Sequence, residues 1–184
     1  SDLLVFGRRA GMGAAEYAAG LASAPAVDEA EVDQLTRDAL VPFERDGGEN
    51  PYALQHELQE TMHNLVGIIR VRSELEEARQ KIGELKERST KVTVEGHRQY
   101  NPGWHLALDL ESLLAVSEAV ANSALLREES RGGHTRDDFP QADPDKWGKL
   151  NNTVRRSGDG IAITQDPVPV MPDELKKLFE EPAK

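Results

Sequence analysis

The residues of this sequence best suited to chemistry gather in one short segment, residues 127–140, which holds three arginines, a histidine, a Gly-Gly pair and four acidic residues. Arginine suits anion recognition because its planar guanidinium can donate two hydrogen bonds to one carboxylate or phosphate. The segment therefore predicts a loop that presents Arg131, His134 and Arg136 to an anionic ligand or to another domain. A second interpretation, which the spacing alone favours, is an internally neutralised loop whose arginines cap the end of the preceding helix.

The remaining residue types that could catalyse a reaction form no convincing constellation. His56 and His63 are seven residues apart on one predicted helix, whereas helical metal ligands commonly sit four apart, and no HExxH motif occurs. Ser130 and His134 lie too close in the chain, with too little around them, to indicate a catalytic triad. We therefore predict no catalytic residue and no metal site in this chain.

Composition excludes several classes of protein. The absence of cysteine excludes disulfides, thiolate metal sites and a cysteine nucleophile. The formal net charge of -11 comes with no evident basic face, which argues against binding to nucleic acid. Gly7, Gly11 and Gly13 follow no predicted strand, so they do not indicate a phosphate-binding loop. The apolar runs are too short for direct insertion into a membrane.

Three amphipathic segments are expected to position the loop. Asn50-Pro51 and Asn101-Pro102 are typical helix starts, and Ser73 with Glu76 resembles a capping box. Each segment carries one apolar stripe at helical spacing. The three stripes are Leu54, Leu58, Met62, Leu65 and Ile69; Leu75, Ala78, Ile82 and Leu85; and Leu106, Leu110, Leu113, Leu114, Val120, Ala121, Ala124 and Leu125. Short connections between them predict an all-α fold, an up-and-down three-helix bundle similar to a spectrin repeat.

Segments of different character flank this bundle. Residues 2–24 are rich in Ala and Gly, which predicts an additional N-terminal helix that must lie against another backbone, because such a helix is weak in isolation. Residues 28–43 predict a short helix. Frequent prolines and glycines after the loop predict an irregular C-terminal tail. Within this tail we expect a turn near Trp147, an extended run over 161–164 and a last short helix over 172–180.

Four ordered segments carry a family resemblance. Residues Glu129 to Pro140 resemble the ESRGxHxRxDFP signature of the succinate dehydrogenase, fumarate reductase and L-aspartate oxidase flavoproteins. Residues 2–11 resemble the helix that follows the family's flavin-contacting GGNSLLD segment. Residues 58–62 and 66–70 resemble the first bundle helix, and 108–114 resemble the family's ALELENLL helix.

The resemblance implies a large FAD-binding domain, a capping domain and this C-terminal helical bundle. It implies interconversion of succinate and fumarate by hydride transfer with FAD, and electron transfer to quinone through an iron–sulfur subunit. The family's catalytic and flavin-binding residues are expected upstream of Ser1, so the fragment alone is predicted to hold no cofactor and to be inactive. Arg131, His134 and Arg136 are the candidate contacts to the FAD-binding domain. The expected location is the cytoplasmic, inner face of the cell membrane, within a membrane-bound complex.

The same resemblance suggests how the chain is divided. We expect residues 1–24 to be the trailing helix of the FAD-binding domain, 25–50 a linker with a short helix, 51–140 the bundle and 141–184 the irregular tail. Two alternatives stay open, namely a free-standing helical interaction module and the C-terminal domain of an L-aspartate oxidase-like flavoprotein. Residues 2–24 discriminate between the first alternative and the domain of a larger protein: a self-contained module would bury their apolar side chains, whereas a piece of a larger protein would expose them.

Overall fold

The computed structural model describes residues 2–158 and 160–180, so the last four residues of the expected tail lie outside the described residues, as do residues 1 and 159. The chain divides into two compact units, residues 1–40 and 41–184. Each unit is described by itself below.

The first unit holds helix α1 (Asp2–Ala19) and most of helix α2 (Glu29–Glu44). None of the residues described for α1 is buried. Leu3 and Leu4 are 91% and 80% exposed, and Phe6 is 64% exposed. Apolar side chains of this size are usually removed from water in a folded protein. The first helix therefore has an apolar surface that nothing in its own unit covers.

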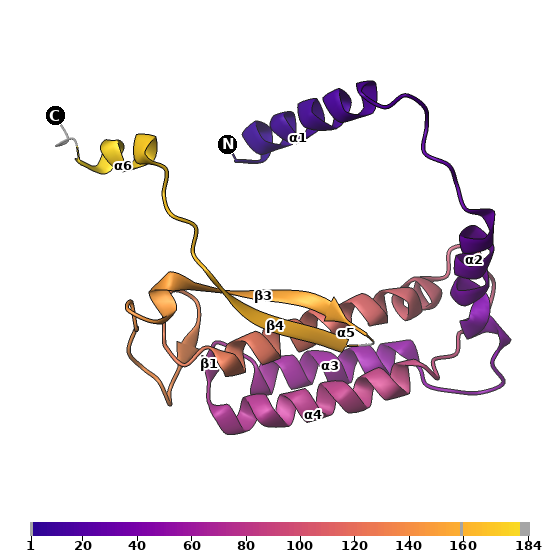
Figure 1. Ribbon diagram of the computed structural model, residues 1–184. Coiled ribbons are helices and arrows are strands. Elements are labelled where there is room, and N and C mark those ends of the chain that lie inside the picture. The colour runs from indigo at the N-terminus through magenta and orange to yellow at the C-terminus, as the bar shows by residue number, and fades with distance from the viewer. Residues whose placement is uncertain (1, 159, 181–184) are drawn as a thin grey trace. The chain divides into compact units, whose positions relative to one another are not determined.

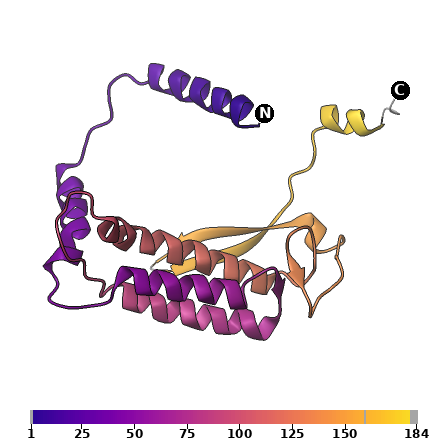
Figure 2. The same ribbon diagram turned by 180° about the vertical axis from the view of Figure 1, so that it is seen from behind.

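The second unit is built on three antiparallel helices, α3 (Pro51–Leu65), α4 (Arg72–Ser89) and α5 (Pro102–Leu126), which lie side by side in both views of the ribbon (Figure 1, Figure 2). Each contacts the other two. The predicted three-helix bundle is thus confirmed. Its core consists of residues from all three stripes, including Leu54, Leu58, Leu75, Ala78, Ile82, Leu85, Leu110, Leu114, Ala121 and Ala124.

The two Asn-Pro helix starts are confirmed. The side chain of Asn50 accepts hydrogen bonds from the backbone N–H groups of Tyr52 and Ala53, at 2.9 and 3.4 Å. The Asn101 side chain likewise accepts from Trp104 N at 3.0 Å. These bonds satisfy N–H groups that a helix leaves free at its first turn.

The capping box expected at Ser73 is wrong. Helix α4 begins at Arg72, preceded by Val71, whose side chain makes no capping hydrogen bond. The backbone N–H of Arg72 donates instead to Asp138 Oδ2, at 3.0 Å, from 66 positions away in the sequence. A carboxylate at this place also favours the positive end of the helix dipole. A distant residue has taken the role assigned to a local one.

Helix α5 is apolar on more sides than the bundle uses. Leu113 and Val120, which were expected on the buried side, are 38% and 39% exposed, and Val116 is 63% exposed. A central helix between two neighbours buries only the stripes that face them. Part of the remaining surface of α5 is covered by the C-terminal part of the chain.

That C-terminal part corrects the expectation of an irregular tail. Strands β3 (Leu150–Ser157) and β4 (Gly160–Pro167) form an antiparallel hairpin, with Leu150 paired to Pro167 and Ser157 to Gly160. The extended run expected over 161–164 lies within β4. The side-chain amide of Asn152 donates to Ser123 O on α5, at 3.2 Å. The partner strand was missed because an Asn pair and an Arg pair flank its two β-branched residues, Thr153 and Val154, so no apolar alternation marks it.

Two short helices complete the described chain. The turn expected near Trp147 is a 3₁₀ helix, η1 (Trp147–Lys149), and the expected last helix is α6 (Asp173–Glu180). Trp147 is only 2% exposed, so this turn is packed into the second unit. None of the helices in the described part of the chain is both long and apolar enough to cross a membrane.

Candidate functional site

The segment that the sequence singled out, residues 127–140, directly follows α5 and is called the arginine loop below. Strand β2 (Thr135–Arg136) of this loop pairs in parallel with strand β1 (Ile69–Arg70), which follows α3. The backbone N–H of Asp137 also donates to Arg70 O, at 3.0 Å. The loop is therefore tied by backbone hydrogen bonds to the connection between α3 and α4.

A tight turn shapes the exposed part of the loop. Arg131 N donates to His134 O at 2.8 Å, and His134 N donates to Arg131 O at 3.0 Å, so Gly132 and Gly133 form the two turn residues. Gly132 has φ 58°, in the left-handed region that favours glycine. Arg131 and both glycines are exposed. Arg131 therefore lies at the surface of the loop.

Arg136 has the opposite environment. Its side chain is fully buried, and its Nη1 donates to three carbonyl oxygens at the end of α5, those of Ala124 at 2.8 Å, Leu125 at 3.1 Å and Arg127 at 3.3 Å. A helix leaves its last four carbonyls without partners, and a cation there is also favoured by the helix dipole. The structure therefore gives Arg136 the helix-capping role that was the second interpretation of the sequence.

The other edge of the Arg136 guanidinium binds Asp138. Nε donates to Oδ1 and Nη2 to Oδ2, both at 2.7 Å, which is a bidentate pair. Arg136 holds the pKa of the Asp138 carboxyl below its usual range, because its hydrogen bonds favour the charged form. Since Asp138 also accepts from the first N–H of α4, this ion pair joins the end of α5 to the start of α4.

Glu129 is the second buried charge of the loop. Its carboxylate is fully buried and accepts from Nε and Nη2 of Arg127, from Nε of Arg131 at 2.9 Å and Nη2 of Arg131 at 3.2 Å, and from the backbone N–H of Asp143 at 2.7 Å. These bonds, led by that of Arg131, outweigh the opposing effect of burial and lower the pKa of Glu129 to about 2. Glu129 is therefore a fixed anion that gathers the loop around it.

His134 is half-buried between a guanidinium, which can only donate hydrogen bonds, and a backbone carbonyl, which can only accept them. Its Nδ1 lies 2.9 Å from Arg70 Nη1, and its Nε2 lies 3.1 Å from Arg127 O. Because the guanidinium can only donate and the carbonyl can only accept, Nδ1 must accept and Nε2–H must donate. The ring is therefore neutral. Burial, and next the charge of Arg70, lower the pKa of His134, in agreement with this hydrogen bonding.

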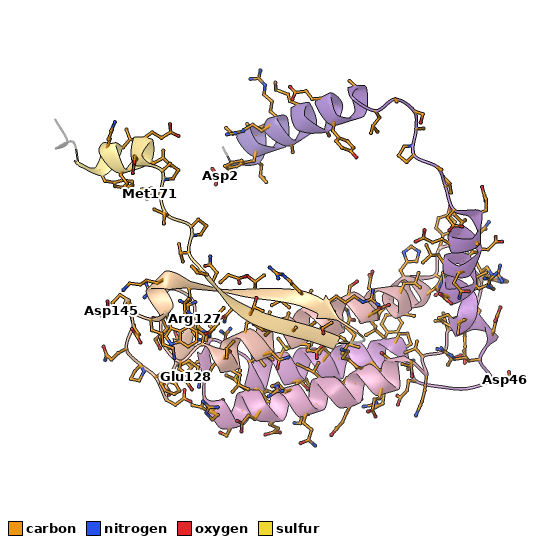
Figure 3. The ribbon with its side chains drawn as sticks, viewed as in Figure 1. Asp2, Asp46, Arg127, Glu128, Asp145 and Met171 are labelled. Atoms are coloured by element: carbon orange, nitrogen blue, oxygen red, sulfur yellow. The ribbon has the colours of Figure 1, made fainter. Side chains whose placement is uncertain are left out.

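Figure 3 shows Arg127 and Glu128 where α5 leaves the bundle, beside the segment that carries Asp145. Nη2 of Arg127 donates to Trp147 O at 2.9 Å, and the Arg127 guanidinium lies 5.6 Å from the Trp147 ring centroid. Glu128 pairs with Arg72 Nη2 at 2.6 Å. The loop is thus also linked to the turn that precedes the hairpin.

The structure brings Arg131, His134 and Arg136 together but gives them different roles. Arg136 is buried, His134 is held between Arg70 and a carbonyl, and Arg131 keeps an exposed edge. Arg70 carries no local signal in the sequence, because it is 64 positions from His134, and it was not among the expected site residues. Glu129 and Asp138 do carry a local signal, since each stands two positions from an arginine of the loop.

This arrangement is suited to holding helices together rather than to catalysis. Glu129 and Asp138 are held as anions by their arginine partners, and both ring nitrogens of His134 are occupied, so these three groups are not poised to transfer protons. In residues 2–158 and 160–180, no cluster of three or more His, Asp or Glu side chains could hold a metal ion. Gly7, Gly11 and Gly13 lie inside α1 rather than between a strand and a helix, so they do not form a phosphate-binding loop.

Comparison with known proteins agrees with the resemblance of the sequence. The family model described as "Fumarate reductase flavoprotein C-term" matches residues 55–177. The chain is 35% identical over 166 residues to a fumarate reductase flavoprotein subunit of Mycobacterium tuberculosis, covering 86% of this chain and 28% of that protein. It is 30% identical over 183 residues to a fumarate reductase flavoprotein subunit of Haemophilus influenzae, covering 96% of this chain and 30% of that protein.

Solved structures give the same result. Mycobacterium smegmatis Sdh1 in complex with UQ1 contains a chain that superposes with a TM-score of 0.90 and 50% identity, over 97% of this chain and 31% of that one. A quinol-fumarate reductase with menaquinol molecules superposes with a TM-score of 0.82 and 28% identity, over 92% and 30%. The chain belongs to the fumarate reductase and succinate dehydrogenase flavoprotein C-terminal family, and it spans less than a third of the length of these relatives.

Proposed function

We propose that this chain is the C-terminal helical support domain of a succinate dehydrogenase or fumarate reductase flavoprotein subunit. The full subunit would interconvert succinate and fumarate, with FAD supplying the hydride chemistry in the FAD-binding domain. Electrons would pass to quinone through an iron–sulfur subunit, within a complex at the cytoplasmic, inner face of the cell membrane. The names of the relatives favour this reaction over oxidation of L-aspartate.

The exposure of α1 is the observation that carries the supporting role. Leu3, Leu4 and Phe6 are all more than 60% exposed, and Tyr17 is 72% exposed. A helix of Ala, Gly and exposed apolar residues is unstable in water by itself. We propose that this helix packs against the FAD-binding domain. A free-standing interaction module would instead be expected to cover such a surface.

Among the three candidate contacts, we propose that Arg131 reaches the FAD-binding domain. Arg136 is buried and occupied by carbonyls of α5 and by Asp138, and His134 is occupied on both ring nitrogens. Arg131 binds Glu129 along one edge, yet its side chain is 41% exposed. Its pKa is raised by the bond to Glu129, so it stays a cation that can bind a carbonyl or a carboxylate of a neighbouring domain.

Arg131→Ala in the full subunit tests this contact. We expect reduced flavin retention, measured as the ratio of FAD to protein after purification, while the 184-residue chain alone stays folded by circular dichroism. Arg98→Ala, at another exposed arginine, serves as the control. Unchanged flavin content, together with the same loss of Tm in the isolated chain as in the full subunit, would show that Arg131 acts within the loop only.

A second experiment tests the supporting role itself. The purified 184-residue chain is expected neither to retain stoichiometric FAD nor to reduce an artificial electron acceptor with succinate. Flavin absorbance at one equivalent, or succinate-dependent dye reduction above that of buffer, would contradict the proposal.

A further inference from the structure

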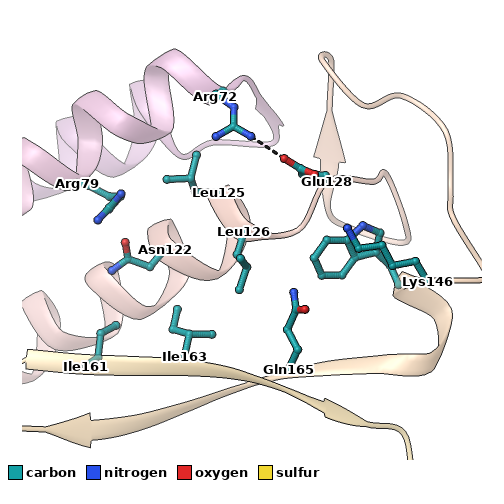
Figure 4. A pocket seen from close by; sticks show the side chains of 11 residues that line it. Arg72, Arg79, Asn122, Leu125, Leu126, Glu128, Lys146, Ile161, Ile163 and Gln165 are labelled. Carbon is teal, nitrogen blue, oxygen red and sulfur yellow. Dashed lines mark hydrogen bonds and ion pairs between the residues drawn. The ribbon is translucent and has the colours of Figure 1, made fainter.

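A hollow of about 620 Å³ lies beside the arginine loop, between α4, α5, the Trp147 turn and β4 (Figure 4). Its size is within the range of small-molecule sites, about 300–1,000 Å³. The eleven residues that line it all belong to the second unit of the chain. The inference below does not rest on the function proposed above.

The charges in this hollow are not balanced. It is lined by three cations, Arg72, Arg79 and Lys146, and by one anion, Glu128. Glu128 is paired with Arg72 at 2.6 Å (Figure 4), which leaves the charges of Arg79 and Lys146. In the described parts of the chain, the Arg79 side chain has no hydrogen bond or ion pair. A net positive hollow in a chain of net charge -11 points to an anionic ligand.

The two cations stand at different ends of the hollow. Arg79 is at one end, seven residues along α4 from the Arg72–Glu128 pair, and seven residues correspond to a rise of about 10 Å along the helix. Lys146 is at the other end, with its Nζ 4.5 Å from the centroid of the Trp147 ring. Figure 4 shows the carboxamide of Asn122 beside Arg79, and that of Gln165 pointing into the hollow on the side of Lys146. Each end thus offers a cation and an amide that can donate hydrogen bonds to one carboxylate.

The wall between these ends is apolar. Ile161 and Ile163 are two residues apart on β4, so both point to the same face, towards Leu126 of α5 (Figure 4). Leu126 is 39% exposed, which leaves apolar surface available for a ligand.

We propose that this hollow binds an elongated organic dianion, a medium-chain α,ω-dicarboxylate with an apolar middle. One carboxylate is held by Arg79 and Asn122, and the other by Lys146 and Gln165. The methylene chain lies along Ile161, Ile163 and Leu126. Glu128 stays bound to Arg72 and sets the polar edge of the site.

The probe for the test is suberate, an eight-carbon dicarboxylate, and Trp147 is the reporter. Trp104 packs on Phe43 with ring centroids 5.4 Å apart and does not line the hollow, so Trp104→Phe leaves one tryptophan at the site. In this background we expect suberate to change the fluorescence of Trp147 saturably. Octanoate, which has one carboxylate, should bind at least about tenfold more weakly, since it loses a charged hydrogen-bonded contact.

Charge-removing variants locate the two ends. Arg79→Gln and Lys146→Gln are each expected to weaken suberate binding at least about tenfold, while one of the two leaves the affinity for octanoate within about threefold. The controls are Lys81→Gln, two positions from Arg79 but outside the hollow, and Lys149→Gln, three positions from Lys146. Three results would each overturn the proposal. They are equal affinity for suberate and octanoate, equal weakening in the control variants, and no saturable binding up to about 10 mM suberate, a concentration well above ordinary metabolite affinities.

Discussion

The two ends of the helical bundle are both closed by arginine–carboxylate pairs, yet they differ in how much water they exclude. At one end, Arg88 near the end of α4 binds Glu49 and Glu57, and the three side chains are 36%, 31% and 44% exposed. At the other end, Arg136 and Glu129 are fully buried within the arginine loop. The same pairing chemistry therefore has different consequences at each end.

The difference follows from the surrounding dielectric. Exposed ion pairs gain little, because water and salt screen them and two long side chains must be held in place. Buried pairs add little net stability over an apolar core, but breaking one leaves an unpaired charge or polar group without water. We therefore expect the arginine loop to be sensitive to single substitutions and the Arg88 cluster to tolerate them.

The largest effect is expected at Arg136. Arg136→Met removes the guanidinium and leaves the Asp138 carboxylate and three carbonyls of α5 without their donor. We expect the free energy of unfolding to fall by about 3–5 kcal/mol, measured by urea denaturation. Adding Asp138→Asn should recover part of this loss. A loss below about 1 kcal/mol would mean that water replaces the guanidinium, and the contrast between the two ends would fail.

Glu129→Gln should have the next largest effect. The amide keeps the shape but removes the charge that faces Arg127 and Arg131, so we expect a loss of about 3 kcal/mol at pH 7. Because folding lowers the pKa of Glu129 from 4.5 to about 2, its stabilisation is present above pH 4.5 and is lost as the pH falls toward 2. The variant should therefore approach the unsubstituted chain in acid. Glu128→Gln, at an exposed pair, is the control and should cost at most about 1 kcal/mol.

His134 should give a smaller, pH-dependent effect. Folding lowers its pKa below 6.5, so the unfolded chain takes up a proton first as the pH falls below that value. Stability should therefore decrease as the pH falls from 6.5 to the folded pKa. His134→Gln should lose this part of the pH dependence of Tm, whereas His97→Gln, at an exposed histidine, should keep it. An unchanged profile in His134→Gln would contradict the neutral ring assigned between Arg70 and Arg127 O.

The smallest effect is expected at the exposed end. Arg88→Met removes four hydrogen bonds to Glu49 and Glu57, but we expect a loss of at most about 1 kcal/mol in dilute buffer. In about 1 M NaCl the variant and the unsubstituted chain should differ by even less, because the Debye length there is about 3 Å. A salt-independent loss as large as that of Arg136→Met would remove the distinction between the two ends.

The sequence by itself determined the parts that depend on neighbouring residues. Asn50-Pro51 and Asn101-Pro102 mark helix starts because the capping side chain and its N–H partners lie within three residues of each other. The apolar stripes defined the three-helix bundle for the same reason, since helical periodicity is a local property. The family also followed from ordered local segments, which the match over residues 55–177 confirms.

Only the tertiary structure decided the features that depend on distant pairs. The start of α4 is capped by Asp138 across 66 positions, so the local Ser73 pattern stayed unused. The polar segment β3 forms a strand because it pairs with β4 and contacts α5. The sequence does not distinguish the environments of the three candidate residues of the loop. Packing in the folded chain buries Arg136, keeps His134 neutral and leaves Arg131 at the surface. Burial and partner choice are properties of the folded chain, because they depend on which segments it brings together.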